Sequence, residues 1–143
     1  MPINGFTMGK DVSIDINTSN GPLRLPAVTK FTSEPVLGNI SVTTLNGVTE
    51  EAPFPKNWKG TVSIERRDST ADDYQAQWEA DYFGGVTRAA STITETIQES
   101  NGSFSTYRYT SVQLQLSKAG DKAGDKTVEQ DFNWTAQRRL KVS

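Results

Sequence analysis

The fold is decided by Lys59-Gly60-Thr61-Val62-Ser63-Ile64-Glu65-Arg66-Arg67, a stretch in which apolar and polar side chains alternate. Successive side chains of a strand point to opposite faces, so Val62 and Ile64 predict the buried face of a strand. The period then changes in Asp68-Ser69-Thr70-Ala71-Asp72-Asp73, which supplies capping side chains and acids for a first helical turn. Gly84-Gly85 stops the pattern, and we therefore predict one α-helix over about residues 69–83.

Working outward from this stretch, period-two alternation predicts strands on both sides of it. They cover residues 11–16, 23–31, 39–45, 91–99, 104–117 and 127–141. Many strands and one helix favour a mainly β fold, an antiparallel β-sandwich or barrel with one flanking α-helix. The length of 143 residues fits a single domain, 1–143. The repeated Ala-Gly-Asp-Lys within residues 118–126 predicts a flexible surface loop.

Aromatic side chains recur along the predicted helix at the spacing of one helical face. Ala71, Tyr74, Trp78 and Tyr82 follow this spacing, and most of the polar residues lie opposite. We expect this stripe to be the face that packs on the core.

Between the predicted strand 39–45 and the stretch that begins at Lys59, apolar and polar residues follow no regular period. This segment carries Pro53, Phe54, Pro55 and Trp58. One interpretation is a long hairpin arm, about residues 45–58, that covers its own core. The other is an extended arm whose Phe54 and Trp58 dock on another subunit, because exposed aromatic side chains otherwise lower solubility. In the second interpretation, the predicted subunit interface consists of Leu45, Val48, Phe54 and Trp58.

The amino-acid composition limits the classes of protein to which the chain can belong. The chain has 17 acidic and 15 basic residues, a net charge of −2, and neither histidine nor cysteine. This excludes thiol nucleophiles, zinc ribbons and Ser-His-Asp catalysis. The acidic pairs Glu50-Glu51 and Asp72-Asp73 do not suggest a shared site, since adjacent side chains diverge on a strand or a helix. We predict a chain that is not an enzyme and that has no cofactor and no metal.

Three stretches together resemble the tail tube proteins of contractile-tailed bacteriophages. The first is Asn4-Gly5-Phe6-Thr7-Met8-Gly9-Lys10-Asp11, which leads into a strand. The second runs from Trp58 through the central strand into Asp72-Asp73-Tyr74. The third is Gln130-Asp131-Phe132-Asn133-Trp134-Thr135-Ala136-Gln137-Arg138-Arg139. The type VI secretion ring protein and the tubes of contractile bacteriocins are similar in fold to this family.

The resemblance implies a virion structural protein of the phage tail, assembled in the host cytoplasm. Six copies would form a ring, rings would stack into the inner tube, and phage DNA would pass through without sequence-specific binding. The implied partners are further copies of the chain, the tail sheath protein, and baseplate and tail-terminator proteins, with no membrane span. Two polar strand faces are expected to line the channel: Asp11, Ser13 and Asp15 on one strand, and Thr92, Thr94 and Thr96 on another.

Two alternatives stay open. Initiator and terminator rings at the two ends of a tube share its fold, so the chain could belong to a baseplate or a tail terminus. In a different class, the abundant hydroxyls (17 Thr and 13 Ser) and the aromatic residues also fit a monomeric carbohydrate-binding β-sandwich. That protein would present Trp58 to a sugar-sized groove.

Overall fold

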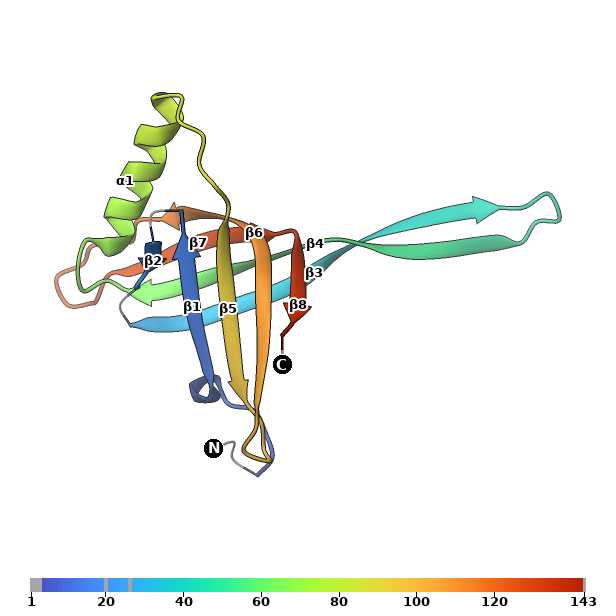
Figure 1. Ribbon diagram of the computed structural model, residues 1–143, viewed down its shortest axis with the longest axis horizontal. Coiled ribbons are helices and arrows are strands. Elements are labelled where there is room, and N and C mark those ends of the chain that lie inside the picture. The colour runs from blue at the N-terminus through green and yellow to red at the C-terminus, as the bar shows by residue number, and fades with distance from the viewer. Residues whose placement is uncertain (1–3, 20, 26, 143) are drawn as a thin grey trace.

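The computed structural model describes residues 4–19, 21–25 and 27–142 (Figure 1). Its elements are η1 (Gly9–Asp11), β1 (Val12–Thr18), β2 (Gly21–Leu23), β3 (Val28–Thr43), β4 (Thr49–Glu65), α1 (Thr70–Phe83), β5 (Ser91–Gln98), β6 (Phe104–Lys118), β7 (Glu129–Ala136) and β8 (Arg138–Lys141). All strand pairs are antiparallel, in the order β2-β1-β5-β6-β7-β4-β3, and β8 also pairs with β6. The predicted mainly β fold with one helix is confirmed.

Strand β6 belongs to two layers. Its residues 104–112 pair with β5, and its residues 113–118 pair with β7. Ser111 lies near the end of the first part, one residue before Val112, and has a φ of 52°. This left-handed conformation lies close to the point where the strand passes from one layer into the other. We call β2, β1, β5, β8 and residues 104–112 the β1 layer, and β3, β4, β7 and residues 113–118 the β4 layer. Their strands cross at a large angle in Figure 1.

Aromatic rings fill the space between the two layers. Tyr109 of the β1 layer lies 4.7 Å from Trp134 of the β4 layer, between ring centroids, and Phe31 stacks on Trp134 at 5.5 Å. Tyr109 and Phe132 are fully buried. The order of strands ends at β2 and β3, and no pairing joins these ends among the described residues, so the chain forms a sandwich and the barrel alternative is not confirmed.

The first half of α1 is fixed to the β4 layer. The Tyr74 ring packs on Phe132, and the Tyr74 hydroxyl donates a 2.8 Å hydrogen bond to the Leu114 carbonyl. The second half extends away from the sheet (Figure 1). Tyr82 and Phe83 are 69% and 83% exposed, so the expectation that the aromatic stripe packs on the core is wrong beyond Trp78.

Three strand boundaries differ from the sequence expectation. Residues 23–31 and 39–45 are not two strands, because β2 ends at Leu23 and β3 runs unbroken from Val28 to Thr43. Pro35 is tolerated within β3 because β3 lies at the end of the sheet, where one edge needs no partner. The predicted strand 127–141 is divided at Gln137 into β7 and β8. Within the described ranges, no helix is long and apolar enough to cross a membrane.

Candidate functional site

The β3–β4 hairpin leaves the sandwich as a two-stranded arm (Figure 1). Strand β4 pairs with β7 only from Trp58 to Glu65, whereas its pairing with β3 continues outward to Thr43↔Thr49. The paired outer part from Leu37 to Thr43 corresponds to about 23 Å of strand. We call residues 37–55 the arm. The predicted arm residues 45–55 form its tip and its β4 side.

Register gives the arm one apolar face. Gly38 lies opposite Phe54, Ile40 opposite Ala52, and Val42 opposite Glu50, and directly opposed residues share a face. A Cβ at Gly38 would lie 2.6 Å from Phe54 Cε2, so the glycine makes room for the Phe54 ring on this face. Ile40 and Val42 are 55% and 53% exposed.

The predicted interface residues occupy different positions along this hairpin. Leu45 is fully exposed in the turn, and Val48 is 52% exposed beside it. Phe54 is 38% exposed on the apolar face. Trp58 lies at the base of the arm and packs partly against the core of its own chain. The apolar surface that a neighbour would contact therefore lies outward of Trp58.

The other face of the arm is mostly polar. It carries Asn39, Ser41, Thr43 and Thr49, and the Ser41 hydroxyl donates to Glu51 at 3.5 Å. Glu50 and Glu51 lie on opposite faces, as the sequence predicted for adjacent strand residues. The arm is therefore a ribbon with one apolar and one polar side.

A charged and aromatic cluster fixes the base of the arm to the β1 layer. Arg139 Nη2 lies 3.0 Å from Glu95 Oε1, and the guanidinium carbon lies 3.7 Å from the centroid of the Tyr107 ring. The same guanidinium lies 5.2 Å from the centroid of the Trp58 ring. Burial raises the pKa of Tyr109, and the neighbouring Glu95 carboxylate acts in the same direction. This cluster sets the position of Trp58, from which the arm departs.

The β1 layer carries a polar outer face that unites the two predicted channel strands. Ser13 pairs with Thr96, Asp15 with Thr94, and Asn17 with Thr92. Strand β6 adds Thr106 beside Thr96 and Arg108 beside Thr94 on the same face. We call this surface the hydroxyl face; it consists of Ser13, Asp15, Thr92, Thr94, Thr96, Thr106 and Arg108. Asp11 lies before β1 in η1, where its carboxylate accepts a 2.9 Å hydrogen bond from the Met8 amide.

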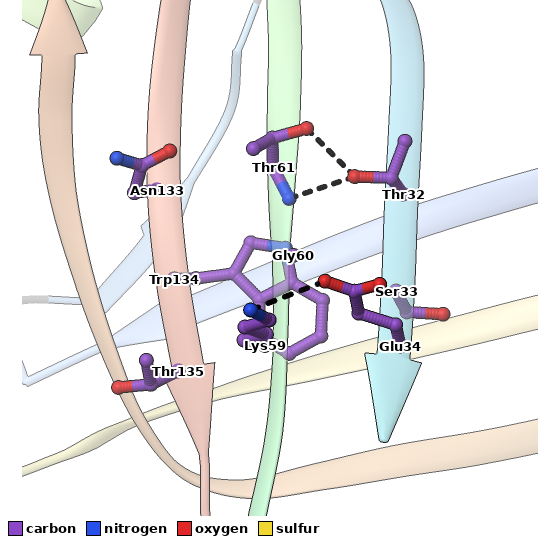
Figure 2. Close-up of a pocket in the computed structure, with 9 residues that line it drawn as sticks. All are labelled: Thr32, Ser33, Glu34, Lys59, Gly60, Thr61, Asn133, Trp134 and Thr135. Atoms are coloured by element: carbon purple, nitrogen blue, oxygen red, sulfur yellow. Dashed lines mark hydrogen bonds and ion pairs between the residues drawn. The ribbon is translucent and has the colours of Figure 1, made fainter. Parts of the chain in front are cut away.

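The outer face of the β4 layer is polar as well. A shallow cavity of about 510 Å³ lies there. Thr32 and Thr61, which share a 2.7 Å hydrogen bond, and Asn133 are among the side chains that line it (Figure 2). Lys59 Nζ and Glu34 Oε1 lie 3.4 Å apart at its rim, both well exposed. Exposed pairs of this kind contribute little free energy and leave the charges solvated. The described residues also include no group of three or more side chains placed to hold a metal ion.

Comparisons with known proteins were made at the level of sequence and of structure. No family model matches the sequence, and no curated protein matches it. A chain of the tube-terminating cap of the anti-feeding prophage matches in structure, with a TM-score of 0.64 at 9% identity over 100% of this chain and 95% of that one. The chain has the fold of contractile-tail tube and terminator proteins.

Two further structures support the same assignment of fold. A chain of the sheath–tube complex of an extracellular contractile injection system (PVC), in its extended state, matches with a TM-score of 0.59 at 10% identity over 91% and 88% of the two chains. A chain of the tail of the empty gene transfer agent (GTA) particle matches at 0.56 and 11% identity, over 96% and 100%. The predicted resemblance is thus confirmed as a likeness of fold.

Several residues of these surfaces were not predicted from the sequence. Ile40 and Val42 fall within the predicted strand 39–45, but their alternation is the same in a buried strand and in an exposed ribbon, so their exposure is not predicted. Arg108 joins the hydroxyl face only through the β5–β6 register. The Glu95–Arg139 pair joins residues 44 positions apart, and no spacing in the sequence indicates it.

Proposed function

We propose that the chain is a structural subunit of a contractile-tail particle, and that six copies form a ring that stacks into the inner tube of the tail. DNA would pass through the channel of this tube without sequence-specific binding. The other partners are the tail sheath, baseplate and tail-terminator proteins, and the chain is a virion component. The likeness of fold over the whole chain supports this proposal.

The arm is the observation that carries the proposal. A two-stranded ribbon alone is marginally stable in water, and a contiguous exposed apolar surface is typical of an interaction site. Ile40 and Val42 on the apolar face, and Leu45 and Val48 in the turn, are each more than half exposed. Contact with a neighbouring copy would bury them, and Phe54 would be buried with them.

The hydroxyl face is our proposal for the channel wall. Its uncharged hydroxyls are solvated readily, and the opposite side of the β1 layer is buried, which suits a wall with core behind it and water in front. Among the described residues, the β1 layer also has strands with one free edge on both sides, β8 on one side and β2 with the first part of β1 on the other. Neighbouring copies can extend the layer at these edges into a closed ring.

Multi-angle light scattering and negative-stain electron microscopy of the purified full chain test the proposal. Six-fold rings, or tubes built from them, are the expected result. A chain that stays monomeric at high concentration in both measurements would contradict it. A monomer that binds glycans would favour the carbohydrate-binding alternative; Trp58 does line a groove, but Arg139 and Tyr109 of its own chain cover part of its ring.

A terminating ring is the second candidate function. Among the structures that match are a tube-terminating cap and a sheath/tube terminator, and each covers 100% of this chain. The same microscopy separates the two functions. A tube subunit gives filaments that lengthen with concentration, whereas a terminator gives single rings of fixed size.

A further inference from the structure

The protruding end of α1 is a surface with no partner within the described part of the chain. Tyr82 and Phe83 contact each other edge to face, with ring centroids 5.2 Å apart, and Trp78 stacks on Tyr82 at 6.1 Å. Glu79 lies three and four positions before Tyr82 and Phe83, so it is on the same side of the helix. The end of α1 therefore combines large aromatic rings with a negative charge.

A groove at the base of the arm has the opposite charge. Leu37, Pro55, Lys56, Trp58 and Arg138 are among the side chains that line it, and its volume is about 440 Å³. We call it the arm-base groove. Apolar and polar side chains line it together, and its basic residues Lys56 and Arg138 are exposed.

The charges that are unpaired within the chain complement each other. In α1, Asp72 pairs with Arg66 and Asp81 pairs with Arg88, whereas Asp73 and Glu79 have no basic partner among residues 4–19, 21–25 and 27–142. In the groove, Arg139 pairs with Glu95. Lys56 and Arg138 form no ion pair within the same ranges. Asp73 lies in the first turn of α1, so Glu79 is the unpaired negative charge near the protruding end that two positive charges at the groove can complement.

The two surfaces lie on opposite sides of the molecule, α1 on one and the arm on the other (Figure 1). They cannot meet within one chain, and a contact between opposite sides of two identical chains is a head-to-tail contact, which closes into a ring when the rotation permits. We propose that the end of α1 of one copy docks in the arm-base groove of the next copy, with Tyr82 and Phe83 as anchors and Glu79 facing Lys56 and Arg138. This rests on the proposed ring assembly and adds which surfaces meet in it.

Charge reversal in the full chain tests the contact. The groove variant Lys56→Glu with Arg138→Glu is compared with the loop variant Lys122→Glu with Lys126→Glu, which changes the net charge equally at exposed positions in the repeat loop. Sedimentation velocity at low ionic strength gives the concentration at half assembly. We expect this concentration to rise at least about tenfold in the groove variant and to stay within about twofold in the loop variant. Adding Glu79→Arg to the groove variant should restore part of the loss.

The outcomes separate this inference from the proposed function. A parent protein that stays monomeric overturns both. If the parent protein forms rings and the groove variant assembles equally well, the helix–groove contact is overturned and the ring proposal is unaffected. Equal loss in the loop variant, or no recovery with Glu79→Arg, also contradicts the contact, since net charge alone would then explain the result.

Cysteine cross-linking gives a second measurement that does not depend on charge. The chain has no cysteine, so Lys56→Cys with Glu79→Cys introduces the only two thiols. The Cα atoms of a facing Lys and Glu lie farther apart than the about 7 Å that a disulfide allows, so a short bismaleimide joins the two thiols. Treated rings should show a ladder of covalent oligomers, whereas Lys122→Cys with Glu79→Cys should not. Monomer bands alone from assembled Lys56→Cys, Glu79→Cys protein would overturn the contact.

Discussion

Gly60 shows how closely the strands of the β4 layer approach the core. A Cβ at this position would overlap the carbonyl oxygen of Thr32 and lie 2.7 Å from Trp134 Cζ2. Neither the backbone of β3 nor the buried indole can move without disturbing the core. We therefore expect Gly60→Ala to lower the free energy of unfolding by about 1–3 kcal/mol, the usual range for overpacking.

Urea denaturation measures this effect, with Gly124→Ala as the control. No atom lies within 4 Å of a Cβ at Gly124, so this change should stay within about 0.5 kcal/mol. Equal unfolding free energies for the two variants would show that the core can relax around residue 60.

The buried hydroxyl of Tyr109 makes stability depend on alkaline pH. Burial raises its pKa, so the folded state holds the phenol proton more tightly than the unfolded chain does. This contribution is fully present below the unfolded pKa, about 10, and is lost as the pH rises above that value toward the folded pKa. The free energy of unfolding should therefore fall as the pH rises above about 10. The fall should be shallower in Tyr109→Phe, and an unchanged alkaline slope in that variant would contradict the assignment.

At the scale of elements, the arm separates folding from assembly. Ile40 lies on its apolar face and Ser41 on its polar face, so Ile40→Thr and Ser41→Thr are a matched pair with the same new side chain. Because residue 40 is exposed in the monomer, Ile40→Thr should change the unfolding free energy by less than about 0.5 kcal/mol.

The same variant should weaken association about tenfold or more, which corresponds to about 1.4 kcal/mol of lost contact. Light scattering over a dilution series gives the association constant, and thermal denaturation followed by circular dichroism checks folding. A loss of folding in Ile40→Thr would mean that the arm covers its own core. An equal loss of assembly in Ser41→Thr would remove the distinction between the faces.

The helix shows which elements the sequence predicts well. Its start depends on local groups: the Thr70 amide donates to Asp68 at 3.0 Å, and this hydrogen bond lowers the pKa of Asp68. Gly84 and Gly85 end it, and such signals can be read from adjacent residues. Helical spacing also shows that Tyr82 and Trp78 share a side, but it cannot show whether anything covers that side.

The strands show why other boundaries of the fold could not be predicted from the sequence. Pro35 and Gly38 favour a break in β3, yet the strand continues because its free edge accepts a proline and because Phe54 covers the glycine. The turn of β6 at Ser111 and the break at Gln137 face each other, since the Gln137 amide donates to the Thr110 carbonyl at 2.8 Å. Both depend on how two distant strands pair, and neither has a local signal in the sequence.

At the scale of the whole molecule, the two polar outer faces raise the question of which one would line the channel of the proposed tube. Asp15, Thr94 and Arg108 form one row across the hydroxyl face, so a negative and a positive charge oppose each other there. Positive side chains bind DNA largely because they neutralise phosphates and so release counterions. A channel wall without net positive charge releases few counterions and therefore binds DNA weakly. In the proposed tube, charge balance and hydroxyls on this face would therefore keep DNA from binding.

A matched pair of lysine substitutions decides between the faces. Thr94→Lys adds one positive charge to the hydroxyl face, and Thr135→Lys adds the same charge to the exposed outer face of the β4 layer. In the proposed ring, Thr94→Lys places a lysine from every copy around the channel, where each can bind a passing phosphate. Triggered DNA release from particles that carry this variant should slow about tenfold at low salt and recover as salt screens the contact. Release should keep the parent rate in Thr135→Lys particles of equal tail length. The reverse pattern would place the β4 layer on the channel, and parent rates in both would mean that the wall charge does not control passage.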